Sequence, residues 1–100
     1  MILIHDAKFP LGQMVATPGA LDALGASGQF AGEFLVRHAR GDWGDVSDDD
    51  KALNDEALSD GSRLLSAYRT AQGVKLWIIT EAVDDEGRRS ATTVLLPEEY

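Results

Sequence analysis

The sequence predicts a single α+β domain in which two to three short helices pack on one face of a small antiparallel sheet. The chain has 100 residues, of which 44% are hydrophobic and 26% charged, as is usual for one small globular domain. Residues 17–60 carry apolar side chains at helical spacing, whereas residues 62–97 switch to runs rich in β-branched and aromatic residues. A three-stranded meander needs a cover to be stable, and the helical block supplies one.

The first 17 residues are expected to form two short strands joined by a turn. The apolar runs 1–4 and 13–16 are separated by a segment that contains the turn formers Pro10 and Gly12. We therefore expect these two runs to contribute to the sheet before the helical block begins.

Thr17 and Pro18 predict the start of a first helix. A threonine hydroxyl caps free backbone N–H groups, and proline is tolerated at the first helical position, where its missing N–H is not needed. Leu21 and Leu24 are the expected buried residues of this helix. Gly25 is expected to end it in a left-handed conformation.

Residues 28–40 predict a second helix with one apolar face. Phe30, Phe34 and His38 recur at intervals of four, which places them on the same side of a helix. Gly41 is the expected end of this helix.

Ser47 predicts the N-cap of a third helix that runs to about residue 58. The three residues after Ser47 are all aspartate, and carboxylates in a first helical turn interact favourably with the helix dipole. Leu53, Ala57 and Leu58 are the expected buried residues of this helix.

Three runs in the last third of the chain predict the strands of an antiparallel meander. They cover residues 63–70, 74–83 and 89–96, and short loops that contain glycine separate them. Pro97 is expected to end the last strand because it has no N–H for the sheet ladder. Neither a repeat nor a flexible linker divides residues 1–100, so we expect one domain.

Most of the net charge lies in one segment. The chain carries 17 acidic and 9 basic residues, a formal net charge of -8. Residues 42–60 contain eight acidic residues and one lysine, and so hold seven of these eight net charges. Such a patch favours binding to a basic protein partner, including binding by mimicry of the phosphate row of DNA. The alternative is a solvated helix N-terminus without a partner. The residues expected to bind the partner are Asp42, Trp43, Asp45, Asp48, Asp49, Asp50, Asp55 and Glu56. The simpler alternative for Trp43, which is flanked by Gly41 and Gly44, is an aromatic side chain that seats its loop on the core.

The same segment has oxygen ligands at the spacing of a calcium-binding loop but not the geometry of one. If Asp45 is position 1, oxygen side chains occupy positions 3 and 5, and Glu56 occupies position 12. Position 6, where a sharp turn requires glycine, is Asp50. The chain also has no cysteine and only two histidines. We therefore expect no metal site and no cofactor.

A second set of residues has the chemistry of a metal-independent endoribonuclease. In such an enzyme histidine acts as acid or base, arginine stabilises the charge on the phosphate, and hydroxyl groups orient it. The candidate catalytic residues are His38, Arg63, Ser66, Tyr68, Thr80 and Thr92, and the arginines that could hold further phosphates are Arg69, Arg88 and Arg89. The alternative role is structural, since threonine and tyrosine are common in strands and histidine interacts favourably with a helix C-terminus.

Several short segments along nearly the whole chain are similar to those of a known family. They include Phe9-Pro10-Leu11-Gly12-Gln13, Gly41-Asp42-Trp43-Gly44, Arg63-Leu64-Leu65-Ser66-Ala67-Tyr68 and Leu76-Trp77-Ile78-Ile79-Thr80-Glu81. In these segments the chain resembles a family of small plasmid-related proteins, carried on bacterial plasmids and integrative elements. That family brings no established activity, so the resemblance implies no functional residue. The strand-rich half also looks loosely like the RelE/barnase-like toxin nucleases.

Three functions therefore stand as hypotheses. The leading one is a noncatalytic binding module from a mobile element, which presents the acidic segment to a basic protein, for instance as an antidefence factor that mimics DNA. The second is a toxin-type endoribonuclease, and the third is a structural homo-oligomer without activity of its own. No apolar run approaches the roughly 20 residues that cross a bilayer, so the sequence predicts a cytoplasmic protein that does not bind membranes.

Overall fold

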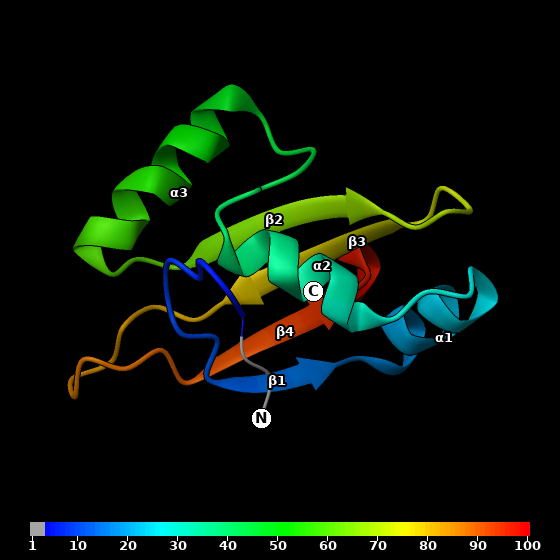
Figure 1. The fold of residues 1–100 in the computed structure, drawn as a ribbon, viewed down its shortest axis with the longest axis horizontal. Coiled ribbons are helices and arrows are strands. Elements are labelled where there is room, and N and C mark those ends of the chain that lie inside the picture. The colour runs from blue at the N-terminus through cyan, green and yellow to red at the C-terminus, as the bar shows by residue number, and fades with distance from the viewer. Residues whose placement is uncertain (1–3) are drawn as a thin grey trace.

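A computed structural model describes residues 4–100, in which three α-helices accompany a four-stranded sheet (Figure 1). The elements in chain order are β1 (Gln13–Ala16), α1 (Pro18–Ala26), α2 (Ala31–Ala39), α3 (Asp48–Asp60), β2 (Leu64–Arg69), β3 (Lys75–Thr80), β4 (Ala91–Leu95) and the 3-10 helix η1 (Pro97–Glu99). The predicted α+β class is confirmed, and β2, β3 and β4 form the predicted antiparallel meander. Of the expected strand over residues 1–4, only Ile4 lies within the described residues, and it is not in a strand.

The sheet has the order β1-β4-β3-β2, so the first strand lies beside the last one. β1 runs parallel to β4, whereas the sequence predicted an antiparallel sheet throughout. A parallel pair requires a crossover connection, and the three helices together with β2 and β3 supply it. Gly12 allows the close approach that begins this pairing. Its φ is +65°, and an added Cβ would lie 2.3 Å from the carbonyl oxygen of Arg89.

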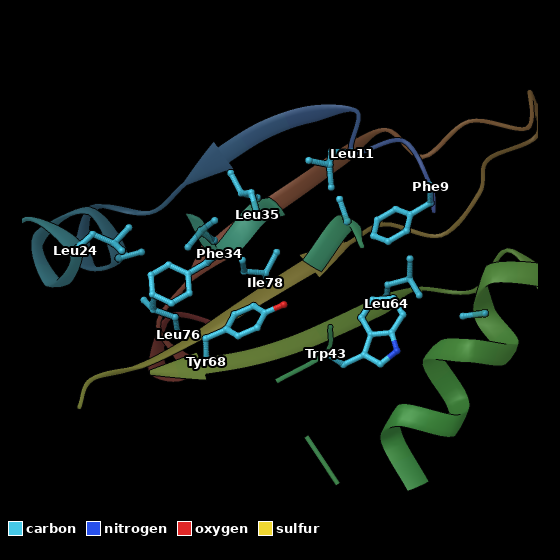
Figure 2. Close-up of a cluster of buried hydrophobic side chains, with 14 residues drawn as sticks. Phe9, Leu11, Leu24, Phe34, Leu35, Trp43, Leu64, Tyr68, Leu76 and Ile78 are labelled. Carbon is cyan, nitrogen blue, oxygen red and sulfur yellow. The ribbon is translucent and has the colours of Figure 1, made fainter. Parts of the chain in front are cut away.

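Helix α2 lies across one face of the sheet and supplies the centre of the core (Figures 1 and 2). Phe34 on this helix packs against Tyr68 of β2, with ring centroids 5.6 Å apart. Alternation along β3 turns three fully buried side chains toward α2, and these are Leu76, Ile78 and Thr80. One face of α2 and one face of the sheet therefore form the centre of the core, and Phe9, Leu24 and Trp43 extend it. No helix within residues 4–100 has the length and apolar composition needed to span a membrane.

Both predicted N-caps are confirmed. Thr17 Oγ1 accepts a hydrogen bond from the Ala20 N–H at 3.3 Å, and Ser47 Oγ accepts one from the Asp50 N–H at 3.1 Å. Gly41, the predicted stop of α2, has a φ of +83°. These signals are local, because each depends only on residues within one helical turn.

Other local predictions are wrong, each for a tertiary reason. Helix α1 continues through Gly25 to Ala26, and the left-handed glycine after it is Gly28. Leu21 is exposed because α1 is short and buries only Ala20 and Leu24. Phe30 is exposed because it is the N-cap residue, outside the apolar face of α2.

The outer edge of β2 is covered by two segments that are not strands. The Ala67 N–H donates to the carbonyl oxygen of Trp43 at 3.1 Å, and the Asp45 N–H donates to the carbonyl oxygen of Ala67 at 2.7 Å. Asn54 of α3 continues this cover, since its side-chain amide donates to Leu65 O at 2.7 Å and accepts from Leu65 N–H at 3.1 Å. The Asn54 side chain thus pairs with β2 as a neighbouring strand would, and it fixes α3 at this edge.

Asn54 also explains why the predicted burial of Leu53 is wrong. Asn54 and Ala57 occupy the side of α3 that faces the sheet. Leu53 consequently lies on the flank of the helix, where 60% of its surface is exposed.

Candidate functional site

Four of the six candidate catalytic residues meet in one hydrogen-bonded chain beneath α2. His38 Nδ1 lies 2.5 Å from Ser66 Oγ, and His38 Nε2 lies 2.8 Å from Thr80 Oγ1. Thr80 Oγ1 lies 2.7 Å from Thr92 Oγ1, which donates to the carbonyl oxygen of Leu11 at 2.7 Å. The four side chains come from three strands and one helix, and all of them are fully buried.

The carbonyl at the end of this chain determines the direction of every hydrogen bond in it. A carbonyl only accepts, so Thr92 uses its single hydrogen on Leu11 and must accept from Thr80. Thr80 has then used its own hydrogen and accepts from His38 Nε2. In the neutral ring Nδ1 is therefore the acceptor, and Ser66 donates to it. His38 is held as the neutral Nε2–H tautomer.

Burial keeps His38 neutral across the physiological range. Removal of the ring from water disfavours the imidazolium, and the nearby Arg89 guanidinium disfavours it further, which together lower the pKa of His38 to about 3. A general acid or base that works near neutral pH needs a pKa near 7 and access to its substrate. His38 has neither.

The stability of the fold is expected to fall when the pH is lowered from about 7.5 to 5. Unfolded His38 takes up a proton below its ordinary pKa of 6.5, whereas folded His38 stays neutral until about pH 3. The unfolded state then binds more protons, so lowering the pH stabilises it. The free energy of unfolding should decrease by about 1.4 kcal/mol per pH unit below 6.5, or about 2 kcal/mol at pH 5. Urea unfolding at the two pH values measures this difference, and His38→Leu should abolish most of it. An equal decrease in that variant would contradict the assignment to His38.

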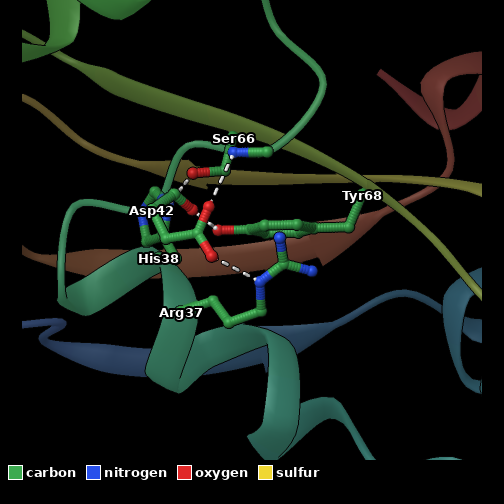
Figure 3. A network of polar contacts seen from close by, with 6 residues as sticks. Arg37, His38, Asp42, Ser66 and Tyr68 are labelled. Carbon is green, nitrogen blue, oxygen red and sulfur yellow. Dashed lines mark hydrogen bonds and ion pairs between the residues drawn. The ribbon is translucent and has the colours of Figure 1, made fainter.

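Tyr68, the fifth candidate, belongs to a neighbouring structural cluster (Figure 3). Its hydroxyl donates to the carbonyl oxygen of Asp42, and burial raises its pKa. The Asp42 carboxylate accepts from Arg37 Nε at 2.7 Å, an interaction that lowers the pKa of Asp42. The Arg37 guanidinium in turn lies 4.5 Å from the centre of the Tyr68 ring. This cluster fixes the chain as it leaves α2.

Arg63, the sixth candidate, lies on the other face of the sheet. It lines a hollow of about 210 Å³ together with Ile79 and Thr93, which alternate with the buried Thr80 and Thr92. Its Nη1 donates to the Tyr100 hydroxyl at 2.5 Å. The sheet therefore separates Arg63 from His38, and the structure does not assemble the six residues around one point that a phosphate can reach.

Arg89, expected to hold phosphate, is instead buried among backbone carbonyls. Its guanidinium donates to Ser62 O at 2.7 Å, Glu81 O at 3.0 Å and Ala57 O at 3.0 Å. These hydrogen bonds connect the C-terminal end of α3 with the start of β2 and the end of β3. The sequence did not indicate this role, because two of the three acceptors, Ser62 and Ala57, lie 27 and 32 positions from Arg89.

Within the acidic segment, several residues expected to bind a partner have structural contacts instead. Trp43 is buried, and its Nε1 donates to Asp55 at 3.0 Å. Asp42 pairs with Arg37, and Asp45 lies 3.9 Å from Arg69. Trp43 therefore seats the loop on the core and is not an exposed anchor for a partner.

Part of the exposed surface of the acidic segment forms a stripe along α3. Asp49, Leu53, Glu56 and Asp60 follow one another at intervals of four, three and four, which places them along one line of the helix. All four are exposed. We call these four residues the acidic stripe; Leu53 is the member that the sequence pattern assigned to the core.

Comparisons with family models, curated proteins and solved structures find no match for this chain. The resemblance to plasmid-related proteins and to toxin nucleases accordingly stays a prediction. Among residues 4–100, no three His, Asp or Glu side chains are grouped so as to hold a metal ion.

Proposed function

We propose that the protein is a noncatalytic binding module that engages a basic protein partner through the exposed face of α3. The observation that carries this proposal is the acidic stripe, in which an exposed leucine lies between carboxylates on a helix that the fold uses only on its opposite side. The nuclease alternative has less support, because its histidine and all four of its hydroxyl-bearing residues are buried.

Helix stability explains only some of the acidic residues on α3. Asp48, Asp49 and Asp50 lie in the first turn, where carboxylates interact favourably with the helix dipole. Asp60 lies in the last turn, where the dipole disfavours negative charge, but its carboxylate accepts from the Ser62 N–H at 2.8 Å. Glu56 lies before that turn, and among the described residues nothing forms an ion pair or hydrogen bond with its carboxylate. Selection for a partner accounts for a charge that neither the helix dipole nor a contact explains.

The chemistry of the stripe indicates what the partner presents. Leu53, which is 60% exposed, offers an apolar anchor, and the surrounding carboxylates offer a rim of negative charge. The matching surface is an apolar contact surrounded by lysine or arginine, as on a basic amphipathic helix. Charge attraction steers such a partner and weakens as salt screens it.

Neutralising the first turn of α3 should abolish this recognition. As a probe we choose a fluorescently labelled amphipathic peptide of leucine and lysine, whose binding is followed by anisotropy at two salt concentrations. The variant with Asp48→Asn, Asp49→Asn and Asp50→Asn should lose at least about tenfold in affinity, and Leu53→Ser should lose a similar factor without any change of charge.

A second triple variant, with the same net charge as the first, tests whether the location of the carboxylates matters. Asp22→Asn, Asp85→Asn and Glu86→Gln remove three exposed carboxylates that lie outside the acidic segment. This variant should retain most of the affinity. Equal losses in the two triple variants, or unchanged binding by Leu53→Ser, would show that the peptide responds only to overall charge and would overturn the proposal.

A further inference from the structure

The two edges of the sheet differ in how their backbone groups are satisfied. The β2 edge is covered by Trp43, Asp45 and Asn54, as described above. At the β1 edge, Gln13 N–H donates to Ser90 O at 3.0 Å and Thr17 N–H donates to Val94 O at 3.0 Å, so alternate residues of β1 face β4. The N–H and C=O groups of Met14 and Ala16 therefore face outward, and no backbone group within residues 4–100 pairs with them.

β1 is short, at four residues, but the side chains that normally prevent edge strands from pairing are missing from it. Its residues, Gln13 to Ala16, include no charge and no proline, both of which proteins commonly place on exposed edges. Met14 is 42% exposed and Val15 is 43% exposed. A hollow of about 270 Å³ lies directly beside the strand, with Ile4, Pro10 and Met14 in its wall. As far as residues 4–100 are concerned, the edge thus combines unpaired hydrogen-bonding groups with an apolar surface.

The distribution of charge indicates which occupant this edge accepts. The acidic helix α3 lies beyond the β2 edge, and β1 forms the opposite edge (Figure 1). Two copies that meet at β1 therefore keep their acidic segments far apart, although each copy carries a net charge of -8. The uncharged strand offers a foreign partner no charge to recognise, whereas a second copy supplies matching apolar side chains and hydrogen-bonding groups.

We propose that β1 pairs antiparallel with β1 of a second copy about a two-fold axis, which joins two four-stranded sheets into one. In this arrangement the outward-facing N–H of Met14 donates to the C=O of Ala16 in the second copy. The N–H of that Ala16 donates in return to the C=O of Met14. Val15 then lies directly opposite its own counterpart, in a non-hydrogen-bonded position where the two Cα atoms are about 4.5 Å apart. The dimer presents one acidic stripe at each end of the joined sheet.

A single cysteine tests both the contact and its register. The chain has no cysteine, so Val15→Cys introduces the only thiol. A separation of about 4.5 Å is within the range that a disulfide spans, and oxidised glutathione should convert this variant to a covalent dimer. Leu21→Cys, at a position that is 55% exposed on α1, is the matched control and should form no disulfide-linked dimer. Equal cross-linking of the two variants, or none of Val15→Cys, would overturn the proposed pairing.

Sedimentation of the unmodified chain measures self-association without a cross-link. The mass should approach twice the 10.8 kDa of the chain as its concentration rises. Val15→Lys should weaken the association at least about tenfold, whereas Leu21→Lys should not. Met14→Pro, which removes only an outward-facing N–H, should weaken it as well, with circular dichroism to check folding. An unmodified chain that stays monomeric at every concentration, or folded β1 variants that dimerise normally, would contradict the proposal. These results do not depend on the acidic stripe, so the two proposals can fail separately.

Discussion

Gly44→Ala should destabilise the fold by about 3–5 kcal/mol, the larger of the two effects we expect from single substitutions. Gly44 has a φ of +73°, and a Cβ added there would lie 2.0 Å from the carbonyl oxygen of Ala67 and 2.7 Å from the Tyr68 ring. Neither neighbour can retreat, because Ala67 is hydrogen-bonded to the segment on both sides of Gly44 and Tyr68 is buried in the core. The unfolding midpoint in urea and the melting temperature measure the loss.

Gly73→Ala is the matched control for Gly44→Ala. Gly73 has a φ of +83°, but an added Cβ would meet no atom within 4 Å. This substitution introduces only the backbone strain of a left-handed alanine, about 1–2 kcal/mol. The difference between the two losses in unfolding free energy measures the cost of the steric overlap between the added Cβ at position 44 and β2. Similar losses for the two would contradict the packing of residues 43–45 against β2.

His38→Ala should destabilise the fold by about 3–4 kcal/mol. The substitution leaves a cavity between α2 and the sheet, and it removes the hydrogen-bond partners of Ser66 and Thr80, which are fully buried. Urea unfolding at pH 7.5, where histidine is neutral in both states, measures this loss separately from the effect of pH. A loss of less than about 1 kcal/mol would show that the network contributes little to stability.

A combined substitution separates the cavity from the unpaired hydroxyl groups. His38→Leu retains most of the side-chain volume, but it removes the ring nitrogens with which the Ser66 and Thr80 hydroxyl groups form hydrogen bonds. Addition of Ser66→Ala and Thr80→Val removes those hydroxyl groups, so the triple variant should be more stable than His38→Leu alone. This gain would confirm that unsatisfied polar groups, and not lost volume, dominate the loss in His38→Leu.

The candidate catalytic residues show the limit of reasoning from residue types. Histidine, serine and threonine were candidates by their chemistry, and the sequence did not show whether they converge; in the structure His38, Ser66, Thr80 and Thr92 do meet. Whether such a cluster faces solvent depends on where α2 lies on the sheet, which the types and spacing of the residues do not reveal. A buried polar network and an active site use the same side chains, and burial alone distinguishes them here.

The acidic segment shows that composition locates charge but does not reveal which charged residues have tertiary contacts. Its charge was visible in composition, but nothing in the sequence distinguished Asp42 and Asp55, which contact the rest of the fold, from the other carboxylates of the segment. The contacts of these two residues involve residues 5 to 26 positions away, such as Arg37 and Tyr68. Only the structure assigns them to the fold and leaves Leu53 and Glu56 exposed.

Features of this protein that depend on nearby residues could be predicted from the sequence. The two helix caps, the glycine stop at Gly41, the three strands of the meander and the position of the negative charge all follow from interactions within a few residues or from composition. Tertiary structure alone decided that β1 joins β4 in parallel, that Asn54 covers the β2 edge, and that His38 is buried and neutral. These features require groups that are distant in the chain to meet, and the free energy that brings them together comes from burial of the whole core.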